Sequence, residues 1–479
     1  MDDINGNPSD HGNENYYQMK QSLFIGVLFL LNAFVTAQQA VITGTAPGAE
    51  GKTITLCKYG DLITLEEKVL DIATIDSAGN FQLSCTPGGA IYVAIYIDFH
   101  KTEMFIESSK KYGLKIAPMD YNYREINPLL HSQNLPAEIK VDLSDLNILI
   151  TEFNTMYDDF ILQNFEALYR ERNKTKLDSF RLQVAERVGE SNNTYFNEYV
   201  YYKLASIEQL TQTLNQSQLS GKYFIDKPVQ YENIEYMDFF NSFFSKYISV
   251  TSRTLHSVDY TPLLKGPDAY LKLMKTLSQD TILKNEQLRE LVLLKGLMEF
   301  YNMTNFNREE ILNVIRSVRS QSKFPGNVTV AENLVKHFMK LKVGTPSPDF
   351  ELFDLQKKPV SLKHFRGKPV LLWFWTTYCP TCLSEMDIIK TLHDKYKEKV
   401  TFIGISADRD FIMMKYFLEK KKDYTWTFLH MGDQIQLLKD YDVKSFPLFI
   451  LIDEEGAVYK YPAEFPSNGL EASLEKMLP

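Results

Sequence analysis

This chain of 479 residues has little cysteine and no long basic run. Four cysteines are too few to hold a fold of this size together by disulfides. A formal net charge of −9 argues against a nucleic-acid partner, which normally requires a cationic surface. The apolar run at residues 23–35 is shorter than the roughly 20 residues that a membrane-spanning helix needs. With 44% hydrophobic and 24% charged residues, the composition is that of a folded protein.

The apolar run has the surroundings of a secretory signal peptide. Met19 and Lys20 precede it, and the small-residue stretch Val-Thr-Ala follows at residues 35–37. The sequence therefore predicts export to the periplasm, with a mature chain that begins near Gln38. Residues 1–18 are polar and acidic, so Met19 is the predicted start. In the alternative, the run is retained and anchors the protein to the membrane.

Two of the cysteines, Cys57 and Cys85, lie in segments that are typical of β-strands. Export would place them in an oxidising compartment, where disulfides persist. Bridging needs Cα atoms within about 7 Å, which a sequence cannot show. A structural disulfide and two buried thiols both stay open.

The mature chain changes pattern twice, and its length suits about three domains. We predict a β-sandwich-like domain at residues 38–135, a helical domain at 136–342 and an α/β domain at 343–479. Residues 1–37 are the upstream extension and signal peptide. A segment with two prolines and a glycine at 343–349 is the predicted linker between the last two domains.

The first two domains are predicted from periodicity. Ile54 and Leu56 alternate with threonines, as in a half-buried strand, and residues 76–81 (DSAGNF) predict a hairpin turn with Gly79 at positive φ. Further on, Leu177 and Phe180 belong to an apolar series with helical spacing, and residues 285–301 repeat that spacing. We interpret the many tyrosines and phenylalanines there as helix packing, and a groove for a partner protein is the alternative.

The last segment alternates strands and helices. Apolar runs at residues 369–375, 400–407 and 446–453 predict buried strands, and a helix is predicted after the first of them. Strand, helix, strand, helix, strand, hairpin and helix is an order typical of a thioredoxin-type fold.

Residues 375–386 (WTTYCPTCLSEM) carry the chemistry of this segment. A strand ending at Trp375 and a helix beginning near Pro380 place Cys379 at the helix N-terminus, where unpaired N–H groups favour a thiolate. Cys379 is thus the expected nucleophile, and Cys382, one turn on, the resolving thiol. Zinc is the alternative, but a structural zinc site needs four ligands and no second cysteine or histidine pair accompanies these two. We predict no metal and no cofactor.

Pro447 opens the third predicted strand. In thioredoxin-type folds a proline that faces the cysteine pair from this position has a cis peptide bond. A cis bond would expose the backbone of Phe446 beside Cys379, where an extended substrate chain can pair with it. The alternative is an ordinary trans proline at a strand edge.

Together, the stretches GTPSPDFELFD, VSLKHFRGKPVLLWFWTTYCPTCLSEM, VTFIGISAD and VKSFPLFILIDEEGAVY resemble the TlpA-like thioredoxin family, including its ResA-type members. The resemblance implies that Cys379 and Cys382 form a redox-active disulfide and that Pro447 is the family's cis-proline. It also implies that Glu385 is the acid of a CxxCxxE pattern. Glu385 is then either a proton acceptor near the resolving thiol or a surface glutamate.

The chain departs from the family at several positions. Tyr378 stands where a tryptophan is usual, Asp387 replaces a common proline, and Trp373 occupies the slot where thioredoxin has an acid. No buried aspartate is therefore expected on that strand to serve the resolving thiol. We assign substrate contact to Phe446, Trp375 and Tyr378.

The resulting prediction is an exported thiol-disulfide oxidoreductase that reduces protein disulfides, with cytochrome c maturation as one role that the family implies. Its partners would be a protein substrate and an upstream electron donor. The region before the oxidoreductase domain would select the substrate, form a homodimer or shield the redox site. One alternative is a binding protein with a vestigial thioredoxin domain. Another is a thiol peroxidase, since Thr376 lies three residues before Cys379, although Leu372 stands where that motif has proline.

Overall fold

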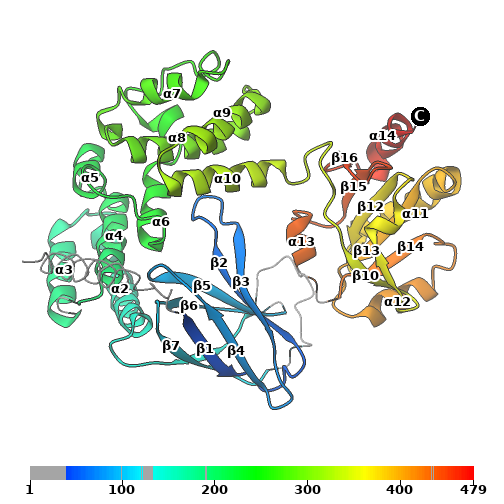
Figure 1. Cartoon of the computed structure of the whole chain (residues 1–479), viewed down its shortest axis with the longest axis horizontal. Helices are drawn as coiled ribbons and strands as arrows, with labels where there is room; N and C mark the ends of the chain where they lie inside the picture. Colours follow the sequence, from blue (N-terminus) through cyan, green and yellow to red (C-terminus); the bar gives the residue numbers. More distant parts are fainter. Residues whose placement is uncertain are drawn as a thin grey trace, which may run out of the picture.

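The structure, a computed structural model, describes residues 39–98, 100–119, 121, 133–188, 191–432, 434 and 436–478. It has a β-rich region, a helical region and a C-terminal domain in that order along the chain (Figure 1). The predicted multidomain order is confirmed. The predicted signal peptide lies outside the described residues.

The β-rich region contains two sheets around one core. Its strands are β1 (Ala40–Thr45), β2 (Thr53–Tyr59), β3 (Glu67–Thr74), β4 (Asn80–Cys85), β5 (Ile91–Ile97), β6 (His100–Ile106), β7 (Lys111–Ile116), β8 (Gln133–Asn134) and β9 (Ala137–Lys140). One sheet has the order β4-β1-β7-β9 and the other β3-β2-β5-β6-β8. Inward side chains of both sheets, such as Ile42 and Ile95, form the shared core. Because β9 pairs with β7, this region extends past residue 135.

The expected hairpin at residues 76–81 is wrong in one respect. Gly79 does have a positive φ of 79°, and the Asp76 N–H donates to the carbonyl of Asn80. However, β3 and β4 belong to different sheets. The turn is therefore a corner between the sheets, which local turn residues alone do not distinguish from a hairpin.

The helical region is built around aromatic side chains. Its elements are α2 (Leu146–Tyr169), α3 (Lys174–Val188), α4 (Thr194–Leu210), α5 (Gln216–Tyr223), α6 (Ile234–Phe243), η1 (Tyr247–Thr251), α7 (Ala269–Leu277), η2 (Thr281–Leu283), α8 (Glu286–Tyr301), α9 (Arg308–Gln321) and α10 (Pro325–Met339). Phe224, Phe239 and Tyr247 are among the rings buried in its largest core. The interpretation of these aromatics as core is confirmed.

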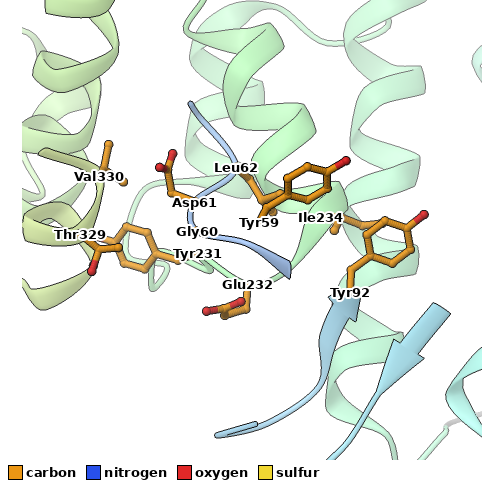
Figure 2. A pocket seen from close by; sticks show the side chains of 11 residues that line it. Tyr59, Gly60, Asp61, Leu62, Tyr92, Tyr231, Glu232, Ile234, Thr329 and Val330 are labelled. Carbon is orange, nitrogen blue, oxygen red and sulfur yellow. The ribbon is translucent and has the colours of Figure 1, made fainter. Parts of the chain in front are cut away.

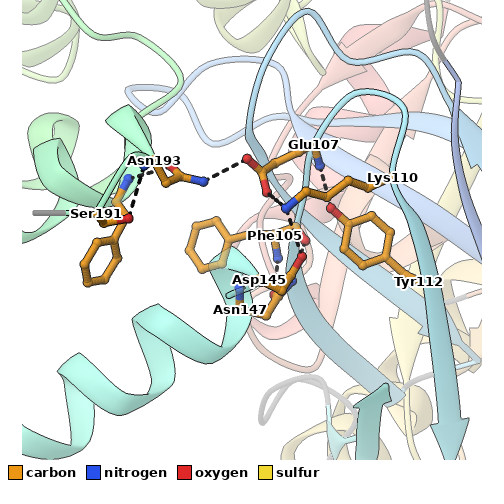
Figure 3. A network of polar contacts seen from close by, with 9 residues as sticks. Phe105, Glu107, Lys110, Tyr112, Asp145, Asn147, Ser191 and Asn193 are labelled. Atoms are coloured by element: carbon orange, nitrogen blue, oxygen red, sulfur yellow. Dashed lines mark hydrogen bonds and ion pairs between the residues drawn. The ribbon is translucent and has the colours of Figure 1, made fainter. Parts of the chain in front are cut away.

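Polar contacts join the β-rich and helical regions. The side chain of Asn147, at the start of α2, accepts from the backbone N–H of Phe105 on β6 and donates to its carbonyl (Figure 3). Asn193, which caps α4, donates to Glu107 in the same network. The two regions also meet around a cavity of about 80 Å³, which is lined by Tyr59 of β2 and by Thr329 and Val330 of α10 (Figure 2). Together these contacts hold the helices on the sheets.

The C-terminal domain contains one seven-stranded sheet with the order β11-β10-β14-β13-β12-β15-β16. Its elements are β10 (Glu351–Asp354), β11 (Pro359–Ser361), η3 (Leu362–Phe365), β12 (Val370–Trp375), α11 (Pro380–Tyr396), β13 (Thr401–Ser406), α12 (Phe411–Glu419), β14 (Thr427–His430), α13 (Gln436–Asp440), β15 (Leu448–Ile452), β16 (Val458–Lys460), η4 (Pro466–Asn468) and α14 (Leu470–Met477). Buried residues of α13 pack on one face, and those of α11, α12 and α14 on the other. All three predicted buried strands are present, and β10, β11 and β14 were not predicted.

The predicted linker is part of this domain. The Gly344 N–H donates to the carbonyl of Val458 on β16, and the Ser347 N–H donates to that of Gly456. Leu341 is already buried in the domain core. On the other side, Lys439 of α13 forms an ion pair of 2.7 Å with Glu67 of β3. The domain is thus attached to the rest of the chain at two places.

Candidate active site

The cysteine pair lies at the N-terminus of α11. Cys379 is the N-cap residue, and its Sγ accepts a hydrogen bond of 3.1 Å from the backbone N–H of Cys382. Pro380, which has no N–H, occupies the first helical turn, where that group would have no partner inside the helix. The two sulfurs are joined in a disulfide, with Cα atoms 5.2 Å apart. Because helix N-termini favour negative charge, this position stabilises a Cys379 thiolate when the bond is reduced.

The two cysteines differ in accessibility. Cys382 is only 1% exposed and belongs to the core beneath α11, whereas Cys379 is half-buried at the edge of that core. An incoming sulfur therefore reaches Cys379 first. This difference agrees with the predicted division into nucleophile and resolving thiol.

Phe446 and Pro447 face Cys379 from the start of β15. The peptide bond between them is cis, and the carbonyl oxygen of Phe446 lies 3.6 Å from the Sγ of Cys379. Pro447 is buried, whereas Phe446 is partly exposed. A backbone carbonyl that is this close to the reacting sulfur can accept a hydrogen bond from an extended chain bound there.

Glu385 is buried one turn beyond Cys382 on α11, so it is not a surface glutamate. Its Oε2 accepts from the Ser467 N–H at 2.9 Å, and its Oε1 accepts from the Ser467 hydroxyl at 2.6 Å. Ser467 belongs to η4, which is distant in sequence. Both oxygens of the acid are thus held in place by Ser467.

A second buried acid, Asp408, supports the loop that leads to Cys379. Asp408 lies two residues after the end of β13 and is fully buried. Its Oδ1 accepts from both the N–H and the hydroxyl of Thr377, each at 2.8 Å, and its Oδ2 accepts from the Ser406 hydroxyl at 2.7 Å. Sequence reasoning gave Asp408 no role. The available signal was an acid placed directly after an apolar strand.

The assignment of Trp375 to substrate contact is wrong. Its side chain is completely buried, with ring centroids 5.5 Å from Phe417 and 5.6 Å from Phe428. The strand that carries it is buried on both faces, so an aromatic residue near the motif does not have to face solvent. Tyr378 is partly exposed and remains near the pair, and burial raises the pKa of its phenol.

Cys57 and Cys85 are free thiols on strands of different sheets. Of the two alternatives, the disulfide is therefore excluded in this structure. Burial raises the pKa of each thiol to about 11, which favours the unreactive protonated form.

No three His, Cys, Asp or Glu side chains gather as a metal site would require anywhere in the described ranges. Across those same residues, no helix is both long and apolar enough to cross a membrane.

Comparison with known proteins identifies the family of the C-terminal domain. The Redoxin family matches residues 342–478. Thiol-disulfide oxidoreductase ResA of Bacillus thuringiensis subsp. konkukian is 37% identical over 145 residues, which are 29% of this chain and 81% of that protein. The chain belongs to the TlpA/ResA-like thioredoxin family. The predicted resemblance is thus confirmed, and the protein is a thioredoxin-like thiol-disulfide oxidoreductase.

Two further proteins are similar to part of this chain. Thioredoxin-like protein YneN of Bacillus subtilis is 32% identical over 133 residues, 26% of this chain and 76% of that protein. Among solved structures, a putative thiol-disulfide oxidoreductase from Bacteroides vulgatus is 26% identical, with a TM-score of 0.26. The alignment covers 29% of this chain and 99% of the Bacteroides chain. Because the Redoxin match spans residues 342–478, the family relationship concerns the C-terminal domain.

Proposed function

We propose that this protein is an exported reductase of protein disulfides that acts through Cys379 and Cys382. The observation that carries the proposal is the position of Cys379. It caps α11, is accessible, and lies 3.6 Å from the carbonyl oxygen of Phe446. The predicted signal peptide supports export, and the ResA relatives support a thiol-disulfide substrate.

In the first step the Cys379 thiolate attacks one sulfur of a substrate disulfide. A bond forms between this sulfur and the Sγ of Cys379, and the substrate S–S bond breaks. The other substrate sulfur leaves as a thiolate and takes up a proton from water. The carbonyl of Phe446 accepts a hydrogen bond from the backbone of the bound chain, which orients the disulfide toward Cys379.

In the second step Cys382 loses its proton and attacks the Sγ of Cys379. The mixed disulfide breaks, the second substrate sulfur leaves and is protonated, and the Cys379–Cys382 disulfide forms. Two electrons have then moved from the protein to its substrate, and both substrate sulfurs have taken their protons from water. Glu385 accepts the proton of Cys382, because it is the buried carboxylate one turn along the same helix. An external dithiol donor restores the starting state.

A redox titration tests this proposal. The full chain is equilibrated with dithiothreitol or glutathione buffers, and tryptophan fluorescence is followed while thiols are trapped for mass analysis. All three tryptophans, Trp373, Trp375 and Trp426, belong to the same core as Cys382, so they report on the state of the pair. Thioredoxin-fold couples span about −270 to −120 mV, and a reductase should lie near the lower end of that range.

The control is Cys379→Ser. We expect one two-electron transition in the wild type and none in the control. A transition that survives in Cys379→Ser, or none in the wild type, contradicts the proposal. A potential near the upper end would reverse the direction, and the protein would then oxidise its partners.

A further inference from the structure

Helix α12 presents a large apolar surface to solvent. Ile412, Met413 and Tyr416 are 74%, 40% and 60% exposed. Met414 and Leu418, on the opposite side of the helix, are buried in the domain core. α12 is therefore apolar on both sides.

In a soluble domain, a helix that is apolar on two sides is normally covered on both of them. Figure 1 shows α12 at the lower edge of the C-terminal domain. The exposed side chains of Ile412, Met413 and Tyr416, here called the α12 face, thus have no cover among the described residues. An exposed apolar face of this kind indicates a site of protein contact.

The α12 face is connected to the redox centre through Asp408. The helix begins three residues after Asp408, whose carboxylate binds Thr377 in the loop before Cys379. Phe411, its first residue, packs against the same core as Cys379 and Phe446. One side of a typical protein interface covers about 800 Å², a patch roughly 30 Å across. A protein that brings a disulfide to Cys379 is therefore large enough to cover both sites.

Three exposed lysines lie on α12 or just after its C-terminal end. Lys415, Lys420 and Lys422 form no ion pair with any described residue, and the Nζ of Lys420 lies 3.9 Å from the ring centroid of Tyr416. Glu419 is the acidic residue within the helix. The net positive charge around an apolar strip favours a partner segment that is both apolar and acidic.

We infer that the α12 face is the docking surface for the protein substrate, and that it binds an apolar, acidic segment beside the substrate's disulfide. The inference rests on the proposed function, because it supplies the substrate class of the same site. Cys379 and the Phe446 carbonyl engage the disulfide, and the α12 face adds affinity and selects the partner.

The experiment uses three designed peptides. Each carries the same disulfide-closed loop; the first has no tail, the second a tail of leucine and glutamate, and the third a tail of leucine and lysine. A tail of about ten residues reaches roughly 30 Å when extended. The pre-reduced full chain is mixed with each peptide, and the second-order rate constant of one turnover is measured.

Two variants remove the two properties of the face separately. The first combines Ile412→Ser, Met413→Ser and Tyr416→Ser, and the second combines Lys415→Glu, Lys420→Glu and Lys422→Glu. Leu182→Ser with Leu271→Ser is the matched control, because these leucines are 73% and 59% exposed on helices of another region. The altered side chains are on the surface, and tryptophan fluorescence verifies that each variant is folded.

We expect the acidic tail to raise the wild-type rate constant at least about tenfold over the tailless peptide, and each α12 variant to remove that gain. The tailless rate should stay unchanged in all variants. An acidic tail that gives no gain, or a gain that survives both variants, overturns the inference. The inference is also overturned if the variants abolish self-association of the chain and leave the gain from the acidic tail unchanged. Failure of the wild type to reduce any peptide would instead contradict the proposed function.

Discussion

The carboxylate of Asp408 accepts two hydrogen bonds from Thr377, one from its backbone N–H and one from its hydroxyl. Thr377 lies two residues before Cys379, and Asp408 is fully buried at the end of the neighbouring strand. The loop that sets the direction of Cys379 is thus fastened to β13. Removing either side of these hydrogen bonds leaves buried polar groups without a partner. This lowers the stability of the fold, because no water replaces the lost bonds.

Asp408→Ala should therefore destabilise the C-terminal domain by about 1 to 3 kcal/mol, because three donors lose their acceptor. Thr377→Val keeps the backbone bond and should cost only about 1 kcal/mol. Urea unfolding followed by tryptophan fluorescence measures both, since every tryptophan lies in this domain. The control is Asp410→Ala, an exposed acid whose side chain makes no capping bond. Equal losses for Asp408 and Asp410 would contradict the role given to the loop.

Glu385→Gln should slow the resolving step, because the buried amide cannot take the proton of Cys382. General bases typically contribute about a hundredfold or more, so the mixed disulfide should accumulate. Rapid quenching in acid followed by intact mass measurement detects it. Asp394→Asn on the same helix is the matched control, since that side chain is 63% exposed. Resolution at the wild-type rate in Glu385→Gln would leave the acid with only a structural role.

Cys57 and Cys85 should be nearly unreactive at pH 8. With a pKa of about 11, roughly 0.1% of each thiol is ionised, against about a quarter at the ordinary value of about 8.5. Alkylation by iodoacetamide, measured by peptide mass analysis, should be slower in the native chain than in urea. Since the folded state keeps these protons to higher pH, the linked stability is complete below about pH 9 and falls as the pH rises through about 11. Rapid native alkylation at either site would contradict this expectation.

Lys439→Glu should loosen the C-terminal domain from β3, because it places two carboxylates together where Lys439 now pairs with Glu67. The ion pair is partly exposed, so its loss should weaken the contact between α13 and β3 by only about 0.2 to 1 kcal/mol. Small-angle scattering should show a larger radius of gyration, and the double exchange Lys439→Glu with Glu67→Lys should restore it. A radius that is the same in all three proteins would mean that the contact does not hold the domain.

Much of the C-terminal domain was predictable because its information is local. Residues 370–375 form one apolar run, and a cysteine followed by proline marks the start of α11 directly. Cys379, Cys382 and the cis bond at Pro447 were predicted from such local patterns. β14 was missed because it has only four residues and no alternation.

The partners of the site were not predictable, because they come from distant parts of the chain. Ser467 meets Glu385 across 82 positions, and Asp408 meets Thr377 across 31. Nothing in either stretch of sequence marks the other. The predicted substrate contact of Trp375 was wrong for the same reason, because packing by α12 and β14 determines that its side chain is buried. Likewise, the sheet to which β4 belongs depends on β1, not on the turn before it.

α10 ends at Met339, and two residues later Leu341 is already buried in the next domain. The connection between α10 and the C-terminal domain is therefore very short. The residues that follow it are bound to the domain, because the Gly344 N–H donates to the carbonyl of Val458. The C-terminal domain and its cysteine pair therefore have less freedom to move than a domain on a long flexible linker. While Lys439 also pairs with Glu67, the position of Cys379 relative to the β-rich region is fixed, so a partner has to come to Cys379.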